Sequence, residues 1–139
     1  KYNLDFSYTS YNQINANGYK IKTILAPKSQ TYKSLLKDCK IGTSTVIIKK
    51  KILKKKFRFS ILKTKEDLLL WLQLSKKYDL IGYNKVLSEW RKLDNSLSSN
   101  TTQKICDGFR LYYRYEGFNI LKSIYYLFLL SLNFIKKNI

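Results

Sequence analysis

Two adjacent carboxylates, Glu66 and Asp67, stand directly before an almost wholly apolar run in the stretch KEDLLLWLQL at residues 65–74. The chain has 27 basic and only 9 acidic residues, so an acidic pair at this place needs an explanation. Acidic side chains in the first turn of a helix stabilise it through the helix dipole, by roughly 0.3–1 kcal/mol each. A carboxylate at a helix N-terminus that faces a cleft can instead act as a general base toward a hydroxyl group. The periodicity by itself favours the stabilising role.

Two other stretches carry hydroxyl groups or a guanidinium, which can hydrogen-bond to a polar ligand. The run Gly42, Thr43, Ser44 and Thr45 offers small side chains and hydroxyls that could contact a sugar, although a buried strand with a glycine turn explains it equally well. Arg91 follows Trp90, and Ser96 and Ser98 lie in the polar stretch behind it. A guanidinium and hydroxyls suit a diphosphate. An ordinary solvated loop remains the alternative.

Composition limits the chemistry further. The chain has no histidine, and its two cysteines, Cys39 and Cys106, lie far apart without a CxxC pattern. This argues against a structural zinc site and a histidine base, and it favours a reducing compartment. The net charge of +18 fits a polyanion or a membrane surface, but codon usage in an AT-rich genome would also enrich lysine. The basic run at 49–58 could bind phosphate, nucleic acid or anionic lipid, or form a solvated hairpin edge.

The elements that must position these groups follow from periodicity and turn residues. We expect strands at 4–11 and 19–25 around an Asn17-Gly18 turn, then a short helix at 31–38 with Thr31 as N-cap and a strand at 41–50. A helix should follow with Thr64 as N-cap, and then short strands at 78–84 and 85–92. A polar loop at 94–102 should lead to two helices within 103–137 that meet near Gly117. Strands interleaved with helices indicate an α/β or α+β class.

The chain length of 139 residues predicts one domain or part of one. We divide it at residue 102, with residues 1–102 as the strand-and-helix part and 103–139 as C-terminal helices. The second helix has only seven unbroken apolar residues, 124–130, whereas a membrane span needs about 20. This segment therefore either lies on a membrane surface or covers the core of the domain.

Three stretches in order, DCKIGTSTVIIKK, KEDLLLWLQL and VLSEWRKLDNSLSSN, resemble the C-terminal half of family 2 glycosyltransferases of the GT-A fold. The closest resemblance is to the bacterial enzymes that build surface glycans, and it covers about residues 4–135. No single stretch is specific, but the ordered set is. The resemblance implies an α/β fold: the C-terminal part of a GT-A mixed sheet with flanking helices and a C-terminal helical segment.

The resemblance also implies roles for particular residues. Asp67 would be the catalytic base of an inverting transfer from a nucleotide-sugar to an acceptor hydroxyl, and Glu66 would help to shape the acceptor site. The substrate-binding residues would be Gly42, Thr43, Ser44, Thr45, Trp71, Arg91, Ser96 and Ser98. Trp90 stands where a tyrosine is more usual in the family, which leaves the local geometry open.

One feature of the family is absent: no DxD motif occurs in the 139 residues. In the family, that motif binds the divalent metal, Mn²⁺ or Mg²⁺, within an N-terminal half that also holds the nucleotide. We therefore expect a chain that lacks the donor-binding half and associates with that half or with itself. The implied partners are a nucleotide-sugar and a glycan or lipid-linked acceptor, and the implied location is cytoplasmic, at the inner face of the membrane.

A basic nucleic-acid-binding protein, of the organellar ribosomal type, is the alternative function. The charge and the 12 tyrosines fit it. It does not explain Glu66 and Asp67 or the ordered stretches, so we expect no specific nucleic-acid partner. An inactive fragment of the transferase fold is the third possibility.

Overall fold

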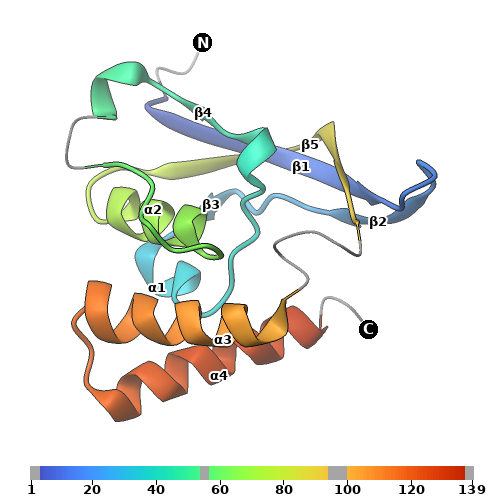
Figure 1. Ribbon diagram of the computed structural model, residues 1–139. Helices are drawn as coiled ribbons and strands as arrows, with labels where there is room; N and C mark the ends of the chain where they lie inside the picture. Colours follow the sequence, from blue (N-terminus) through green and yellow to red (C-terminus); the bar gives the residue numbers. More distant parts are fainter. Residues whose placement is uncertain (1–3, 54–56, 94–99, 137–139) are drawn as a thin grey trace.

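The computed structural model describes residues 4–53, 57–93 and 100–136. Its elements, shown in Figure 1, are β1 (Phe6–Ile14), β2 (Lys20–Ile24), β3 (Ser29–Gln30), α1 (Tyr32–Leu35), the 3₁₀ turn η1 (Thr43–Thr45), β4 (Ile47–Ile48), the 3₁₀ turn η2 (Lys50–Ile52), α2 (Glu66–Ser75), β5 (Leu80–Arg91), α3 (Thr101–Arg110), the π-helical turn η4 (Leu111–Tyr115) and α4 (Ile120–Lys136).

The strands form one mixed sheet with the order β2-β1-β5-β3, and β4 pairs with the beginning of β1. Strands β1 and β5 are parallel neighbours, whereas β2 and β4 run antiparallel to β1 and β3 runs antiparallel to β5. The expected fold class is confirmed: the protein is α/β with a mixed sheet and flanking helices, consistent with part of a GT-A domain.

The predicted β1–β2 hairpin is confirmed, and the short helix predicted at 31–38 is present but spans only Tyr32–Leu35. The Asn15 side chain accepts hydrogen bonds from the Asn17 and Tyr19 backbone N–H groups, at 3.0 and 2.9 Å, and Gly18 takes the positive φ of +88° that the turn needs. Thr31 caps α1 by accepting a hydrogen bond from the Ser34 backbone N–H.

Three predictions are wrong: the single strand at 41–50, the two separate strands at 78–84 and 85–92, and the helix start with Thr64 as N-cap. The segment 41–50 is not one strand, because the Thr45 backbone N–H and hydroxyl both donate to the Gly42 carbonyl and close a 3₁₀ turn. The strands predicted at 78–84 and 85–92 are one strand, β5, with an irregular register: Thr9 pairs with Tyr83, and Ser10 pairs with Val86. Two extra residues of β5 are thus accommodated where a strand break was predicted.

The helix expected to begin with Thr64 as N-cap instead begins after Lys65. Thr64 is buried, and its hydroxyl donates to Asp107 rather than accepting a bond from α2. The two C-terminal helices do meet near Gly117, which has a φ of +69°. Asn100 caps α3 by accepting a hydrogen bond from the Gln103 backbone N–H, whereas residues 94–99 of the predicted loop lie outside the described part of the chain.

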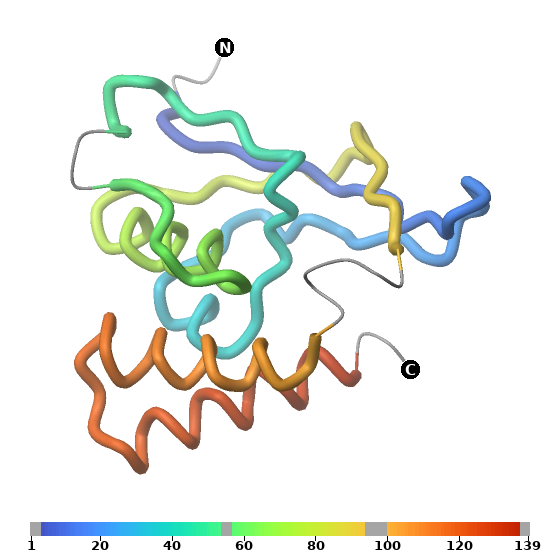
Figure 2. Tube along the Cα trace, viewed as in Figure 1, coloured from blue at the N-terminus to red at the C-terminus, as the bar shows by residue number. Residues whose placement is uncertain are grey.

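The elements stack in layers, as Figures 1 and 2 show: the sheet, then α1 and α2, then the pair α3 and α4 on the far side of these helices. The core is built on α2, where Leu68, Leu69, Leu70, Trp71, Leu72 and Leu74 are all buried. Leu111, Tyr112 and Leu130 of the C-terminal helices belong to the same apolar cluster. The division at residue 102 stays a prediction.

Gly82 in β5 is a position where only glycine fits. A Cβ atom there would lie 1.9 Å from the Pro27 carbonyl oxygen, which also accepts a hydrogen bond from the Tyr8 hydroxyl at 3.0 Å. We therefore expect Gly82→Ala to lower the free energy of unfolding in urea by about 2 kcal/mol. Tyr83→Ala, at the exposed neighbouring position, is the control and should cost less; equal losses would show that the close approach at Gly82 is unimportant.

Candidate active site

Asp67 lies in the first turn of α2, as the acidic pair predicted. Helix α2 ends at Ser75 and β5 begins at Leu80, so the C-terminal end of the helix lies near the start of β5. The N-terminal end of α2 therefore lies toward the carboxyl ends of the parallel strands β1 and β5. In open α/β sheets this is the edge at which ligands bind.

Two hydrogen bonds hold the Asp67 carboxylate. The Leu68 backbone N–H donates to Oδ1 at 2.7 Å, and the Thr43 hydroxyl donates to Oδ2 at 3.0 Å. The second bond brings Thr43 next to Asp67, although none of residues 43–45 is among the described residues that line the neighbouring pocket. Ser44 is exposed beside Thr43, whereas Thr45 is 6% exposed and its hydroxyl is bonded to the Gly42 carbonyl.

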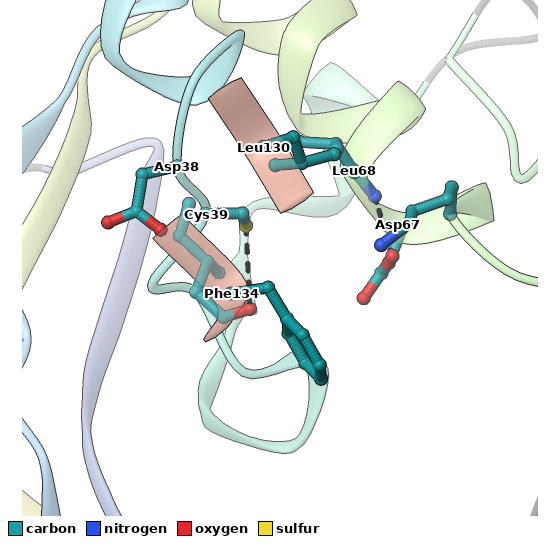
Figure 3. A pocket seen from close by; sticks show the side chains of 8 residues that line it. Asp38, Cys39, Asp67, Leu68, Leu130 and Phe134 are labelled. Carbon is teal, nitrogen blue, oxygen red and sulfur yellow. Dashed lines mark hydrogen bonds between the residues drawn. The ribbon is translucent and has the colours of Figure 1, made fainter. Parts of the chain in front are cut away.

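Asp67 opens onto a pocket of about 160 Å³. Figure 3 shows this pocket with Asp67 on one side and Cys39 on the other. The pocket is lined by Asp38, Cys39, Ile41, Lys65, Asp67, Leu68, Leu130 and Phe134. Sites for whole small-molecule ligands usually measure about 300–1,000 Å³, so this pocket has room for part of a ligand next to the carboxylate.

The groups around Asp67 have shifted pKa values. Burial lowers the pKa of the Lys65 ammonium, although the nearby Asp67 charge acts in the opposite direction. Burial raises the pKa of the Glu66 carboxyl, and the charges of Asp67 and Asp107 add to this rise. Burial, with smaller contributions from Cys39 and Asp67, raises the pKa of Tyr11 to about 12. The site thus combines a carboxylate, a partly desolvated cation and a phenol that stays neutral at ordinary pH.

Tyr11 also explains the glycine at position 42. A Cβ atom on Gly42 would lie 2.8 Å from the Tyr11 ring, so a larger residue would have to move this ring. Gly42 therefore lets the 43–45 turn approach β1 closely. Its role in the structure is to place Thr43 next to Asp67, since Gly42 has no side chain of its own to offer a ligand.

Lys65 and Asp107 hold the start of α2 in place, and the sequence analysis did not predict this role for either residue. Lys65 has a φ of +88°, which is uncommon for a residue other than glycine and is often found at functional sites. Asp107 of α3 is 1% exposed, and its Oδ2 accepts hydrogen bonds from the Thr64 backbone N–H and hydroxyl, at 2.9 and 3.1 Å. A sequence signal existed, because Asp107 precedes Leu111 by four residues and so lies on the buried face of its helix.

The remaining predicted residues do not gather at the pocket. Arg91 lies at the end of β5 and donates to the carbonyls of Asn15 and Ala16, so it holds the β1–β2 turn. Trp71 is 1% exposed in the core, where its ring centroid lies 5.1 Å from that of Phe6. Glu66 is half-buried and is not among the described residues that line the pocket. Ser96 and Ser98 lie outside the described residues.

The described residues do not fit a divalent metal. Within 4–53, 57–93 and 100–136, no group of three or more His, Cys, Asp or Glu residues could hold a metal ion. Asp67 and Asp38 line the same pocket, but Lys65 lies there as well. A site for Mn²⁺ or Mg²⁺ needs several oxygen ligands, so we assign no metal-dependent step to these residues.

Two bacterial proteins are similar to this chain. A putative teichuronic acid biosynthesis glycosyltransferase, TuaG, from Bacillus subtilis is 32% identical over 136 residues, which is 96% of this chain and 54% of TuaG. The Escherichia coli protein WfgD, a UDP-Glc:α-D-GlcNAc-diphosphoundecaprenol β-1,3-glucosyltransferase, is 35% identical over 107 residues, which is 76% of this chain and 41% of WfgD. The chain thus spans about half the length of these relatives. No family model and no solved structure matches it.

Proposed function

Because the chain is related to bacterial surface-glycan glycosyltransferases over almost its whole length, we propose that it forms the acceptor side of such an enzyme. The proposed reaction transfers a sugar from a nucleotide-sugar to an acceptor hydroxyl, with inversion at the anomeric carbon. The observation that carries the proposal is the Asp67 carboxylate, held by Thr43 and the Leu68 backbone at the mouth of a pocket.

In the proposed reaction Asp67 is the general base. It removes the proton from the acceptor hydroxyl while that oxygen bonds to the anomeric carbon and the bond to the nucleoside diphosphate breaks. The helix N-terminus favours the ionised carboxylate, which the reaction needs at its start. Thr43 and the Leu68 N–H each occupy one oxygen of Asp67 with one bond, and a carboxylate oxygen can accept a further one from the acceptor hydroxyl.

The pocket suits an acceptor with both polar and apolar parts. Lys65 can hydrogen-bond to sugar hydroxyls, and the apolar side chains of Leu68, Leu130 and Phe134 can pack against the apolar face of a sugar. WfgD, by its name, acts on a sugar carried by diphosphoundecaprenol, and TuaG by its name serves teichuronic acid synthesis. We therefore propose a glycan or lipid-linked acceptor for this protein too.

Donor binding is proposed to need residues beyond these 139. The printed sequence has no DxD motif, and the described residues do not fit a metal. In this proposal the nucleotide and its Mn²⁺ or Mg²⁺ bind to a separate half, and Glu66, Ser44 and Thr43 help to shape the acceptor side. Ser96 and Ser98 remain candidates for contacts with the leaving diphosphate, whereas Arg91 holds the β1–β2 turn.

The test is a comparison of the 139-residue chain with a protein in which a donor-binding half precedes it. We expect calorimetry with several nucleotide-sugars and Mn²⁺ or Mg²⁺ to detect no micromolar binding to the 139 residues alone, and we expect no sugar transfer. Light scattering should show that this chain associates, because apolar side chains on the sheet side, such as Ile47 and Leu25, are exposed. A monomer with saturable micromolar donor binding would contradict the assignment of the nucleotide site to another half.

A further inference from the structure

The outer face of α4 is apolar along its length. Leu121 is 80% exposed, Phe128 is 59% exposed and Ile124 is 51% exposed, and Ile120, Tyr125 and Ile135 are exposed as well. Spacings of three and four residues place side chains on one side of a helix. We call these six residues the outer stripe of α4. A surface helix of a globular protein normally has polar residues on this side.

The inner face of the same helix is already used by the fold. Ser123 and Leu130 are buried, and Tyr126 and Leu127 pack against the core cluster. In Figure 1, α4 is the outermost helix, with α3 between much of it and the rest of the molecule. Apart from the ring contact of Tyr125 with its neighbour Tyr126, no described segment covers the outer stripe, which lies opposite the core face of α4.

The charged side chains that α3, η4 and α4 expose to the surface are all positive. Residues 101–136 contain five basic residues, Lys104, Arg110, Arg114, Lys122 and Lys136, and only two acidic ones. Asp107 is 1% exposed, and the Glu116 side chain is also 1% exposed and is paired with Lys76 at 2.7 Å. Helices α3 and α4 thus present apolar side chains and positive charge to the outside.

We propose that α4 lies in the surface of an anionic lipid bilayer, with the outer stripe among the acyl chains and the basic side chains at the headgroups. An amphipathic helix with cations beside its apolar face binds anionic membranes in this way. None of the described helices is long and apolar enough to cross a bilayer. A second copy of the chain is a poorer occupant of this stripe, because the exposed lysines and arginines of α3 and α4 would lie near those of the other copy.

The membrane surface would also lie close to the candidate active site. Leu130 and Phe134 of α4 line the pocket that contains Asp67, so the helix that carries the outer stripe also forms a wall of the site. Binding through the outer stripe would thus hold the pocket about one helix diameter, roughly 10–12 Å, from the bilayer surface. The membrane proposal itself does not depend on the transferase proposal, since vesicle binding can be measured without a sugar donor.

The test is flotation of the protein with vesicles of phosphatidylcholine alone or with 30–40% phosphatidylglycerol (roughly, the anionic content that makes a surface strongly negative). We expect binding to the anionic vesicles and little to the neutral ones. The change Ile124→Ser should weaken binding by about tenfold, because it removes one large apolar side chain from the membrane. The double change Leu121→Ser with Phe128→Ser should abolish it.

Ile21→Ser is the matched control, because Ile21 in β2 is 50% exposed and Ile124 is 51% exposed. The control should bind like the unchanged protein, and thermal unfolding should confirm that all variants are folded. Equal loss in Ile21→Ser and Ile124→Ser, or no loss in either, would overturn the assignment to α4. So would a stable dimer that ignores vesicles and is broken by the α4 changes, because the stripe would then be an interface between copies.

Discussion

Replacing Asp67 with asparagine is expected to lower the turnover of sugar transfer by ~10²-fold or more in an enzyme that contains this chain and a donor-binding half. Asparagine has nearly the same shape: its carbonyl oxygen can accept the bond from the Leu68 N–H, and its NH₂ group can donate to the Thr43 hydroxyl. It cannot remove a proton from the acceptor hydroxyl. The loss should therefore appear in turnover at saturating donor and acceptor, whereas the affinity for the donor should change little.

Asp79→Asn is the matched control for this prediction. Asp79 follows the other end of α2 and is exposed, so the same chemical change there should leave turnover within about twofold, as for surface substitutions without special contacts. Near-normal turnover in Asp67→Asn would return Asp67 to its simpler role, an acidic residue that stabilises the first turn of a helix. Initial rates at several acceptor concentrations distinguish the two results.

Removing the Asp107 carboxylate is expected to cost the fold about 3 kcal/mol in the free energy of unfolding, as for buried donors that lose their acceptor. In Asp107→Ala the Thr64 backbone N–H and hydroxyl lose the oxygen that accepts both of their bonds. These donors are buried, so water cannot replace the carboxylate at low cost. Urea unfolding measures the loss, and the exposed Asp79→Ala serves as the control.

The same residue gives an expected pH dependence. Burial alone would raise the pKa of the Asp107 carboxyl, but hydrogen bonds from Gln103 and Thr64 and the Arg110 charge together lower it below its ordinary value. A lowered pKa in the folded state stabilises the fold fully above the unfolded value of about 3.9, and this contribution is lost as the pH falls through the folded value. The difference in unfolding free energy between the unchanged protein and Asp107→Ala should therefore be constant from about pH 5 to 7, which lies above the unfolded-state pKa of about 3.9. It should shrink below about pH 4. A difference that did not shrink in acid would show that Asp107 acts through packing rather than through its charge.

Local signals in the sequence were enough for several elements. The β1–β2 hairpin depends on Asn15, Asn17 and Gly18, which bond to one another within five residues. The break between α3 and α4 depends on Gly117, which takes a backbone conformation that few other residues adopt. The acidic pair predicted the start of α2 to within a residue, because carboxylates favour the first turn of a helix.

The sequence alone could not show which distant segments meet. Thr64 fits an N-cap by its type, yet its partner is Asp107, 43 residues away, and the cap position falls on Lys65. Trp71 and Arg91 have side chains that could bind a substrate, but the core encloses the first and the hairpin turn engages the second. Such outcomes depend on how the whole chain packs, and no local propensity encodes them.

The sequence was enough for the α/β class, the place of the carboxylates at the start of α2, and the likeness to surface-glycan glycosyltransferases. Only the tertiary structure decided that Thr43 donates to Asp67, that Leu130 and Phe134 of α4 close the pocket, and that the other side of α4 faces outward with its apolar residues. The physical reason is that burial of an apolar side chain is favourable whichever surface covers it. Which surface does so depends on how all the other elements pack around the same core.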